Sequence, residues 1–408
     1  MPRKRYTPED IIQHLRTVEL ETGKGLAVLD ACRKLGITEH TSYRWKKEFC
    51  FRRVLTAVCL LLVIALPIRS NAQAVPLPSF NVDKTQISVS GLSGGGFMAV
   101  QFDVAYSSLL NGAGIIAGGP YYCAQGDLET ATTVCSCTGL FPAFCSLVSG
   151  GTHVPALIKI TDQNAQDGVV DDTNHLTNQK IFLFSGKLDS KVPQPVMNDL
   201  QTYYRHYVGN ANIFYEKNLR AEHAMPTDSF GNPCKTSQHP YINRCRYDAA
   251  GETLKWIYGS NLKSKSTGAL SGSFIQFDQS EFITDPTFHG MDDSGWLFVP
   301  ASCQQGELCK LHVVFHGCKQ AQSYVPIDIP FGPIAGAYGT TFVKKTGYNE
   351  WADVNNIIVL YPQAATSAGN PNACWDWWGY DDPNYAKKTG RQMAAVKAMI
   401  DRISGVSH

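Results

Sequence analysis

A serine set among glycines is the residue of this chain whose surroundings most clearly predict chemistry. Residues 91–95 read GLSGG, a match to the pattern GxSxG with Ser93 at its centre. A predicted strand at 87–90 precedes this turn and a predicted helix from residue 97 follows it, which is the setting that exposes a nucleophilic hydroxyl. Small flanking residues let the backbone pass through the strained turn. Ser93 is therefore predicted to be the nucleophile of a serine esterase that works through an acyl-enzyme intermediate.

An acid and a base should lie on loops that follow later strands of the same sheet. Asp189 follows the predicted strand at 180–185, and His223 follows the next predicted strand, at 213–216. The order Ser, Asp, His along the chain is that of the α/β-hydrolases. Rival carboxylates lie in one polar segment that no apolar strand precedes, and loop or helix-cap roles are expected for them: Asp162, Asp171 and Asp172.

Two backbone N–H groups must hold the oxyanion that forms when the serine attacks an ester. The first is that of Gly94, directly after the nucleophile, and the second is expected from the His-Gly turn that ends the predicted strand at 311–316. This strand follows the nucleophile, although the usual hydrolase order places it earlier. Moving four late strands ahead of residue 87 restores that order and predicts a circular permutation: 274–277, 296–299, 311–316 and 357–361.

The elements that would position these groups alternate along the chain from residue 75 onward. Short apolar segments bounded by Gly, Pro, Asn or Asp are predicted to be strands, and residues 97–109 and 391–403 are predicted to be helices. The alternation predicts an α/β fold with a mostly parallel central sheet. Besides those already named, the predicted strands include residues 114–117.

The composition and the cysteines indicate a loop-rich protein from an oxidising compartment. Charged residues make up 17% of the 408 residues, below the roughly 25% of an average globular protein. Ten of the 13 cysteines follow residue 75, without a CxxC pair, which favours disulfides over zinc. His312 and His316 are not expected to share a metal, because positions i and i+4 of a strand are ~13 Å apart. We therefore expect no metal site.

Residues 51–74 are typical of a secretory signal peptide. Two arginines at 52 and 53 precede a short apolar run at 54–66, and the segment ends in the cleavage-site pattern AQA at 72–74. The run is shorter than the ~20 residues that a spanning helix needs, although an uncleaved membrane anchor is an alternative. We expect a secreted protein, extracellular or periplasmic, without a stable membrane partner.

Residues 1–50 predict a small all-α segment of a different kind. Apolar residues at helical spacing predict helices at 8–21 and 25–35, and a third helix is expected near Thr41. The order helix, turn, basic helix matches a helix-turn-helix, and LDACRKLGIT with SYRWKKEF resembles the N-terminal module of insertion-sequence transposase accessory proteins. A DNA-binding module ahead of an export signal is not coherent, so we interpret it as a fusion or a translation start placed too far upstream. We expect no nucleic-acid partner for a mature form that begins near Val75.

From about Gln86 to its end, the chain resembles the secreted, single-domain, circularly permuted poly(3-hydroxybutyrate) depolymerases. The likeness is carried, in order, by GLSGG, FSGKLD at 184–189, LKWIYG at 254–259, FHGC at 315–318 and CWDW at 374–377. The resemblance implies a triad of Ser93, Asp189 and His223. It also implies oxyanion amides at Gly94 and Cys318, and a disulfide from Cys318 to Cys374 that holds Trp375 against the substrate.

The resemblance implies hydrolysis of poly(3-hydroxybutyrate) or related short-chain polyhydroxyalkanoates to oligomers and monomers. We expect an enzyme that needs no cofactor and is monomeric. A feruloyl or acetylxylan esterase of the same fold is the alternative, and a DNA-binding protein acting through residues 1–50 is an alternative of another class. The expected domains are 1–50, 51–74 and 75–408. Short separations, which keep loop closure inexpensive in entropy, predict two further disulfides: Cys234 with Cys245, and Cys303 with Cys309. The remaining cysteines stay unassigned: Cys123, Cys135, Cys137 and Cys145.

Overall fold

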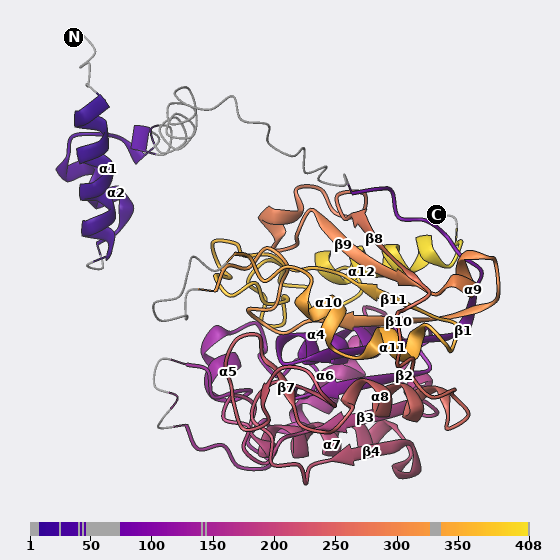
Figure 1. Ribbon diagram of the computed structural model, residues 1–408. Coiled ribbons are helices and arrows are strands. Elements are labelled where there is room, and N and C mark those ends of the chain that lie inside the picture. The colour runs from indigo at the N-terminus through magenta and orange to yellow at the C-terminus, as the bar shows by residue number, and fades with distance from the viewer. Residues whose placement is uncertain are drawn as a thin grey trace, which may run out of the picture. The chain divides into compact units, whose positions relative to one another are not determined.

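The chain divides into two compact units, Met1–Asn71 and Ala72–His408. The computed structural model describes residues 8–23, 26–39, 41–42, 45, 74–139, 142, 145–326 and 336–406 (Figure 1). The predicted signal segment at 51–74 therefore lies outside the described residues, apart from Ala74. Among the described helices, none combines the length and the apolar character that crossing a membrane would require.

The first unit is a small helical cluster. It contains α1 (Pro8–Gly23) and α2 (Val28–Lys34), close to the two predicted helices. Of the third expected helix, residues 41, 42 and 45 are helical, and its other positions lie outside the described residues. A small buried core holds these helices together, because their apolar positions recur on one face: Val18, Ala31, Cys32, Ile37 and Trp45.

The second unit is built around an eight-stranded sheet in the order β4-β3-β2-β1-β10-β11-β9-β8. The six strands from β4 to β11 pair in parallel, whereas β9 runs antiparallel to both of its neighbours. This arrangement confirms the predicted, mostly parallel α/β sheet. The strands are β1 (Val82–Leu92), β2 (Gly112–Ile116), β3 (Lys180–Phe184), β4 (Ile213–Glu216), β8 (Ser273–Asp278), β9 (Ser294–Val299), β10 (Cys309–Phe315) and β11 (Ile357–Tyr361).

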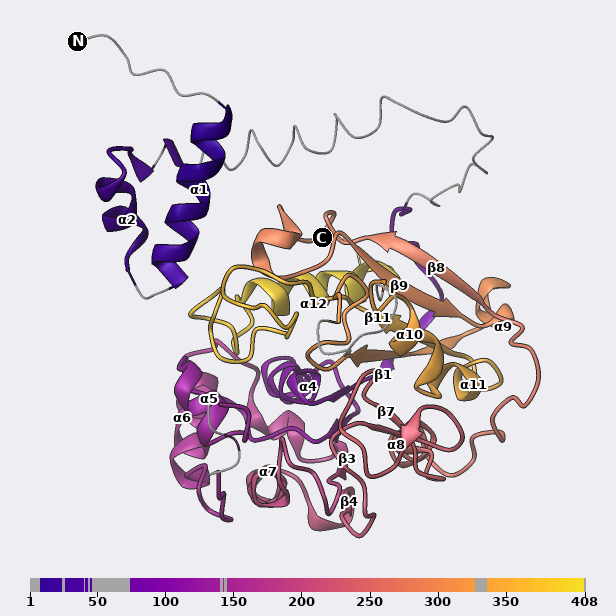
Figure 2. The same ribbon diagram turned by 60° about the vertical axis from the view of Figure 1, so that its left-hand side comes forward.

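Helices cover both faces of this sheet, as is usual for parallel sheets. Figure 2 shows α4, α7 and α12 on one side and α8 and α11 on the other. Residues of β2 and β11 are all buried, as expected for strands covered from both sides. The principal helices are α4 (Gly94–Ala105), α5 (Leu128–Thr133), α6 (Val154–Gln166), α7 (Gln194–Tyr207), α8 (Ala249–Tyr258), α9 (Ala301–Gln304), α10 (Thr341–Lys345), α11 (Tyr348–Ala352) and α12 (Arg391–Ile403).

The first strand of the unit in sequence, β1, lies in the middle of the sheet between β2 and β10. Its residue Gly91 pairs with Phe315 of β10, so the end of the serine strand lies beside the end of a strand more than 200 residues later. Parallel strands end at the same edge of a sheet, so the loops after β1, β3, β4 and β10 can meet there. A small second sheet, in the order β5-β7-β6, follows β4: β5 (Met225–Thr227), β6 (Asn232–Pro233) and β7 (Ile242–Arg244).

Five disulfides cross-link the second unit. They include the three pairs expected from the sequence, Cys234–Cys245, Cys303–Cys309 and Cys318–Cys374. The four unassigned cysteines form two further bonds, Cys123–Cys135 and Cys137–Cys145. Among the described cysteines, only Cys32 of the first unit is free, and it is buried.

Candidate active site

Ser93 lies in a sharp turn between β1 and α4. Its backbone has φ 58° and ψ −124°, a conformation that a residue with a side chain rarely adopts. The turn closes tightly, because a Cβ on Gly91 would overlap the carbonyl oxygen of Gly95, and a Cβ on Gly95 would overlap those of Phe315 and His316. Glycine at both positions therefore lets α4 start directly against the end of β10. The half-buried Ser93 side chain lies at that junction.

Asp189 and His223 form a hydrogen-bonded pair on the neighbouring loops. The Nδ1 atom of His223 lies 2.9 Å from Oδ2 and 3.0 Å from Oδ1 of Asp189. The same carboxylate accepts the backbone N–H groups of Lys191, at 2.9 Å, and Val192, at 2.8 Å. These bonds fix the orientation of the acid, which in turn leaves Nε2 of the histidine for chemistry.

The loops after β3 and β4 are joined by backbone hydrogen bonds, which bring Asp189 and His223 together. The N–H of Leu188 donates to the carbonyl of Ala221 at 3.0 Å, and Lys187 donates to Leu219 at 2.8 Å. On the histidine side, the Glu222 carboxylate accepts the N–H of His223 at 2.7 Å. The dyad is thus held by both backbone and side-chain bonds.

Among the described residues, no hydrogen bond joins Ser93 to His223, although both line one cavity. Such bonds are often long before a substrate is bound. The three rival carboxylates lie elsewhere: Asp162 is in α6 and accepts a hydrogen bond from Tyr207, Asp171 pairs with Lys388, and Asp172 caps a short helix. None of the three lines this cavity.

The turn after β10 presents a second backbone N–H beside that of Gly94. Within the described part of the chain, neither the Gly94 nor the Cys318 amide has a protein acceptor. The preceding Gly317 amide is occupied, because it donates to Oε1 of Gln320 at 2.9 Å. Gln320 in turn donates to the carbonyls of Pro240 and Tyr241, which fixes the turn against the small second sheet. Two free amides in a rigid setting are suited to stabilising an oxyanion.

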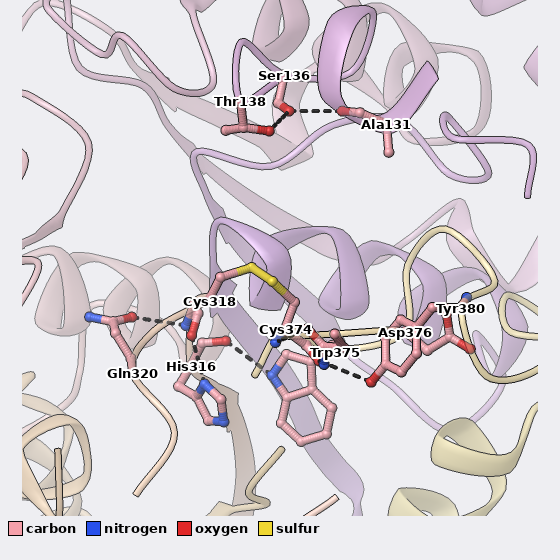
Figure 3. Close-up of a disulfide and its surroundings, with 12 residues drawn as sticks. Ala131, Ser136, Thr138, His316, Cys318, Gln320, Cys374, Trp375, Asp376 and Tyr380 are labelled. Carbon is pink, nitrogen blue, oxygen red and sulfur yellow. Dashed lines mark hydrogen bonds between the residues drawn. A yellow bond between two sulfur atoms is a disulfide. The ribbon is translucent and has the colours of Figure 1, made fainter. Parts of the chain in front are cut away.

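The Cys318–Cys374 disulfide connects this turn to the segment that carries the tryptophans (Figure 3). Trp375 is fully buried, and its indole N–H donates to the His316 carbonyl at 3.0 Å. The expected contact between Trp375 and the substrate is therefore corrected: this indole lies behind the turn and does not line the cavity. Its contribution is to hold the backbone from which the Cys318 amide projects.

The serine, the histidine and the two free amides open into one cavity of about 430 Å³, within the usual range of small-molecule sites. Much of its wall is apolar, from Leu92, Phe97, Val192 and the indoles of Trp377 and Trp378. A second wall comes from the disulfide-linked segment around α5, including Leu128, Ala131, Thr132, Ser136 and Thr138. This wall was not predicted from the sequence, although four unassigned cysteines close together indicate a disulfide-linked segment. We call this segment the α5 cap.

Trp377 carries an unsatisfied donor at the cavity wall. Its ring stacks on Phe97 with centroids 4.1 Å apart, and its buried Nε1 has no hydrogen-bond partner among the described residues. A Cβ placed on Gly94 would lie 3.4 Å from this nitrogen and 2.9 Å from the Cys318 sulfur. An unpaired buried N–H is costly, and this one lies close to Gly94 in a residue that lines the cavity.

His312 and His316 are structural groups of the core. His312 contacts the hydroxyls of Ser88 and Ser90 through its two ring nitrogens, at 2.7 and 2.8 Å. His316 accepts the Ala364 amide at 3.0 Å through Nε2. Burial lowers the pKa of His312 to about 3 and that of His316 to about 4, so both rings are neutral. Among the described residues, no cluster of three or more potential metal ligands is present.

A buried carboxylate lies behind the nucleophile in α4. Asp103 accepts a hydrogen bond from the Tyr204 hydroxyl of α7 at 2.8 Å, and its second oxygen has no partner among the described residues. Complete burial raises the pKa of Asp103 from 3.8 to about 7. This hydrogen bond connects α4, which follows Ser93, to α7, which follows Asp189.

Comparisons with known proteins give two kinds of match. A family model described as Transposase matches residues 1–55. A poly(3-hydroxybutyrate) depolymerase of Delftia acidovorans is 49% identical over 335 residues, covering 81% of this chain and 62% of that protein. A polyhydroxybutyrate depolymerase of Talaromyces funiculosus is 40% identical over 350 residues, covering 82% of this chain and 94% of that protein. The chain therefore spans less than two thirds of the Delftia relative.

Two solved structures match with a TM-score of 0.69 and 36% identity, over 82% of this chain and all of theirs. One is the crystal structure of a PHB depolymerase from Penicillium funiculosum. The other is a serine-to-alanine variant of a PHB depolymerase in complex with an R3HB trimer.

Proposed function

The chain belongs to the polyhydroxybutyrate depolymerase family, and on that premise we propose that it is a secreted serine esterase acting on poly(3-hydroxybutyrate) or related short-chain polyhydroxyalkanoates. The observation that carries the proposal is the single cavity shared by Ser93, His223 and the amide-bearing residues Gly94 and Cys318. The complex of a related PHB depolymerase with an R3HB trimer supports this substrate class.

In the proposed mechanism, Nε2 of His223 takes the proton of Ser93 as the serine oxygen attacks the ester carbonyl. Asp189 holds the imidazole in the required tautomer and stabilises the imidazolium. The Gly94 and Cys318 amides donate to the oxyanion. His223 then protonates the departing alcohol, and a water molecule, deprotonated by the same nitrogen, releases the acyl group as a carboxylate. Each step uses groups of this chain and one water.

The Trp377 indole N–H is proposed to donate to an ester oxygen next to the oxyanion amides. The unsatisfied state of this nitrogen and its closeness to Gly94 support the assignment. Trp377 replaces Trp375 as the proposed substrate-contacting tryptophan.

We also propose that the catalytic unit is circularly permuted relative to other α/β-hydrolases. Its support is the strand order, in which four strands that follow the nucleophile in sequence complete the sheet on one side of β1. Secretion is supported by five disulfides in the catalytic unit and by the signal-like residues 51–74. For residues 1–50 we propose no part in the mature enzyme, and we propose that the mature enzyme is monomeric.

The decisive experiment measures clearing of poly(3-hydroxybutyrate) granules by the purified enzyme, beside release of ferulate or acetate from xylan. Granule clearing that is lost in Ser93→Ala, with circular dichroism unchanged, is the expected result. Xylan deacylation without granule clearing would assign the chain to plant cell-wall esters instead. Activity on short esters that survives in Ser93→Ala would refute the mechanism.

A further inference from the structure

The charged side chains of the catalytic cavity are all cationic. Its lining includes Lys191 and Lys319 but no Asp or Glu among the described residues. The acid of the dyad, Asp189, is screened behind His223 and is saturated by backbone N–H groups. A neutral polyester segment does not require such a charge, so a cavity lysine without an ion pair is suited to an anionic ligand.

Lys191 lies beside the Asp189–His223 pair, and in the proposed mechanism His223 protonates the departing alcohol. Its backbone N–H donates to Asp189, and its carbonyl accepts the N–H of Cys137 at 2.7 Å, so the residue is fixed between the acid loop and the α5 cap. Its half-buried side chain makes no ion pair with any described residue. The neighbouring Glu222 carboxylate is directed at the amides of Ser190 and His223. The Lys191 ammonium is therefore available to a ligand.

The direction of the polyester chain supplies the anion on this side. Each ester joins the carboxyl group of one unit to the hydroxyl group of the next, and cleavage leaves the acyl part on Ser93. The alcohol that His223 protonates belongs to the part of the chain that runs to the free carboxylate. A cavity of about 430 Å³ admits a short segment, so this carboxylate lies near the histidine side when the scissile bond is close to that end.

Resting on the proposed function, we infer that Lys191 binds the terminal carboxylate of the substrate and directs cleavage toward that end. The enzyme is thereby suited to short anionic 3-hydroxyalkanoate oligomers as well as to the polymer. Lys319, next to Cys318 in the turn after β10, is expected to have no part in this preference.

The test compares the R3HB trimer as a free carboxylate with its methyl ester. For the wild type we expect kcat/KM for the acid to exceed that for the ester by roughly three- to tenfold, mainly through KM, as a partly desolvated charge pair allows. Added salt should shrink this ratio. In Lys191→Met the ratio should fall to about one, and Lys191→Arg should keep most of it. The ratio cancels any effect of these changes on the triad.

Two matched controls complete the design. Lys187→Met removes an exposed lysine of the same loop that does not line the cavity, and Lys319→Met removes the other cavity lysine. Both variants should keep the wild-type ratio. Equal ratios in wild type and Lys191→Met, or a ratio lost only in Lys319→Met, would overturn the inference. If wild type cleaved neither trimer, the proposed polyester activity itself would fail.

Discussion

Ser93 and the turn that carries Cys318 lie at the ends of the two central strands, β1 and β10, whereas Asp189 and His223 lie on loops after β3 and β4, toward the edge of the sheet. We call Ser93 and the Cys318 turn the central half of the site. Backbone packing positions it, because glycines allow α4 to contact β10 and a disulfide lies behind the turn. Asp189 and His223 form the outer half, which is positioned by hydrogen bonds to the Asp189 carboxylate. The positions of the groups in the central half therefore depend on shape, whereas those in the outer half depend on charge and hydrogen bonding.

The largest expected effect tests the outer half. Asp189→Asn should keep the fold but lower kcat by about 10⁴-fold, because an amide stabilises the wrong tautomer of His223. Steady-state kinetics on a soluble short-chain ester measure this. Asp162→Asn, at a rival carboxylate outside the cavity, is the control and should retain full activity. A loss below tenfold in Asp189→Asn would mean that another group orients the histidine.

The burial of Asp103, the residue of α4 that accepts a hydrogen bond from Tyr204 of α7, should make stability depend on pH. The folded pKa of Asp103 is raised to about 7 from 3.8, so the folded state holds this proton more tightly than the unfolded state. Its stabilising contribution is complete below about pH 4 and is lost as the pH rises to about 7, on the order of 2–4 kcal/mol.

Asp103→Asn should flatten this dependence of the unfolding free energy on pH, measured by denaturant titration at several pH values. A smaller slope should remain, because burial also raises the pKa of Asp376 to about 6. An unchanged slope in the variant would show that Asp103 does not titrate in this range.

The central half should instead be sensitive to a single added methyl group. In Gly95→Ala the new Cβ would overlap two carbonyl oxygens of the β10 end, so α4 must move away. We expect a loss of about 1–3 kcal/mol in stability, together with a large loss of activity from the displaced Ser93. Thermal unfolding and kinetics measure both. Gly209→Ala, where a Cβ meets no atom within 4 Å, should change neither.

The smallest expected effect concerns Trp377, which lines the cavity. Trp377→Phe keeps an aromatic ring to stack on Phe97 but removes the unpaired indole N–H. We expect kcat/KM on the R3HB trimer to fall by roughly three- to tenfold, the value of one modest hydrogen bond. Trp256→Phe, at an indole bonded to Asn212 outside the cavity, is the control. An unchanged kcat/KM in Trp377→Phe would remove this indole from substrate recognition.

The sequence allowed the outer half to be predicted because apolar runs such as 180–184 and 213–216 are strands whose ends are visible in the residue pattern. Other features of the site depend on tertiary contacts, which the residue pattern does not show. In CWDW, only the packing behind the disulfide determines that Trp375 faces the core and Trp377 the cavity. Asp162, expected in a loop or at a helix cap, lies inside α6, where the neighbouring buried Thr161 hydrogen-bonds to Tyr203 of α7.

The cysteines of the catalytic unit are joined in a simple order along the chain. Every disulfide connects a cysteine to the next one in sequence, from Cys123–Cys135 to Cys318–Cys374. If this unit is oxidised as it emerges from a translocation pore, it acquires these bonds by pairing every second cysteine with the unpaired cysteine just before it. Such a protein needs an oxidase during export but little isomerase activity afterwards, which favours periplasmic production of the enzyme.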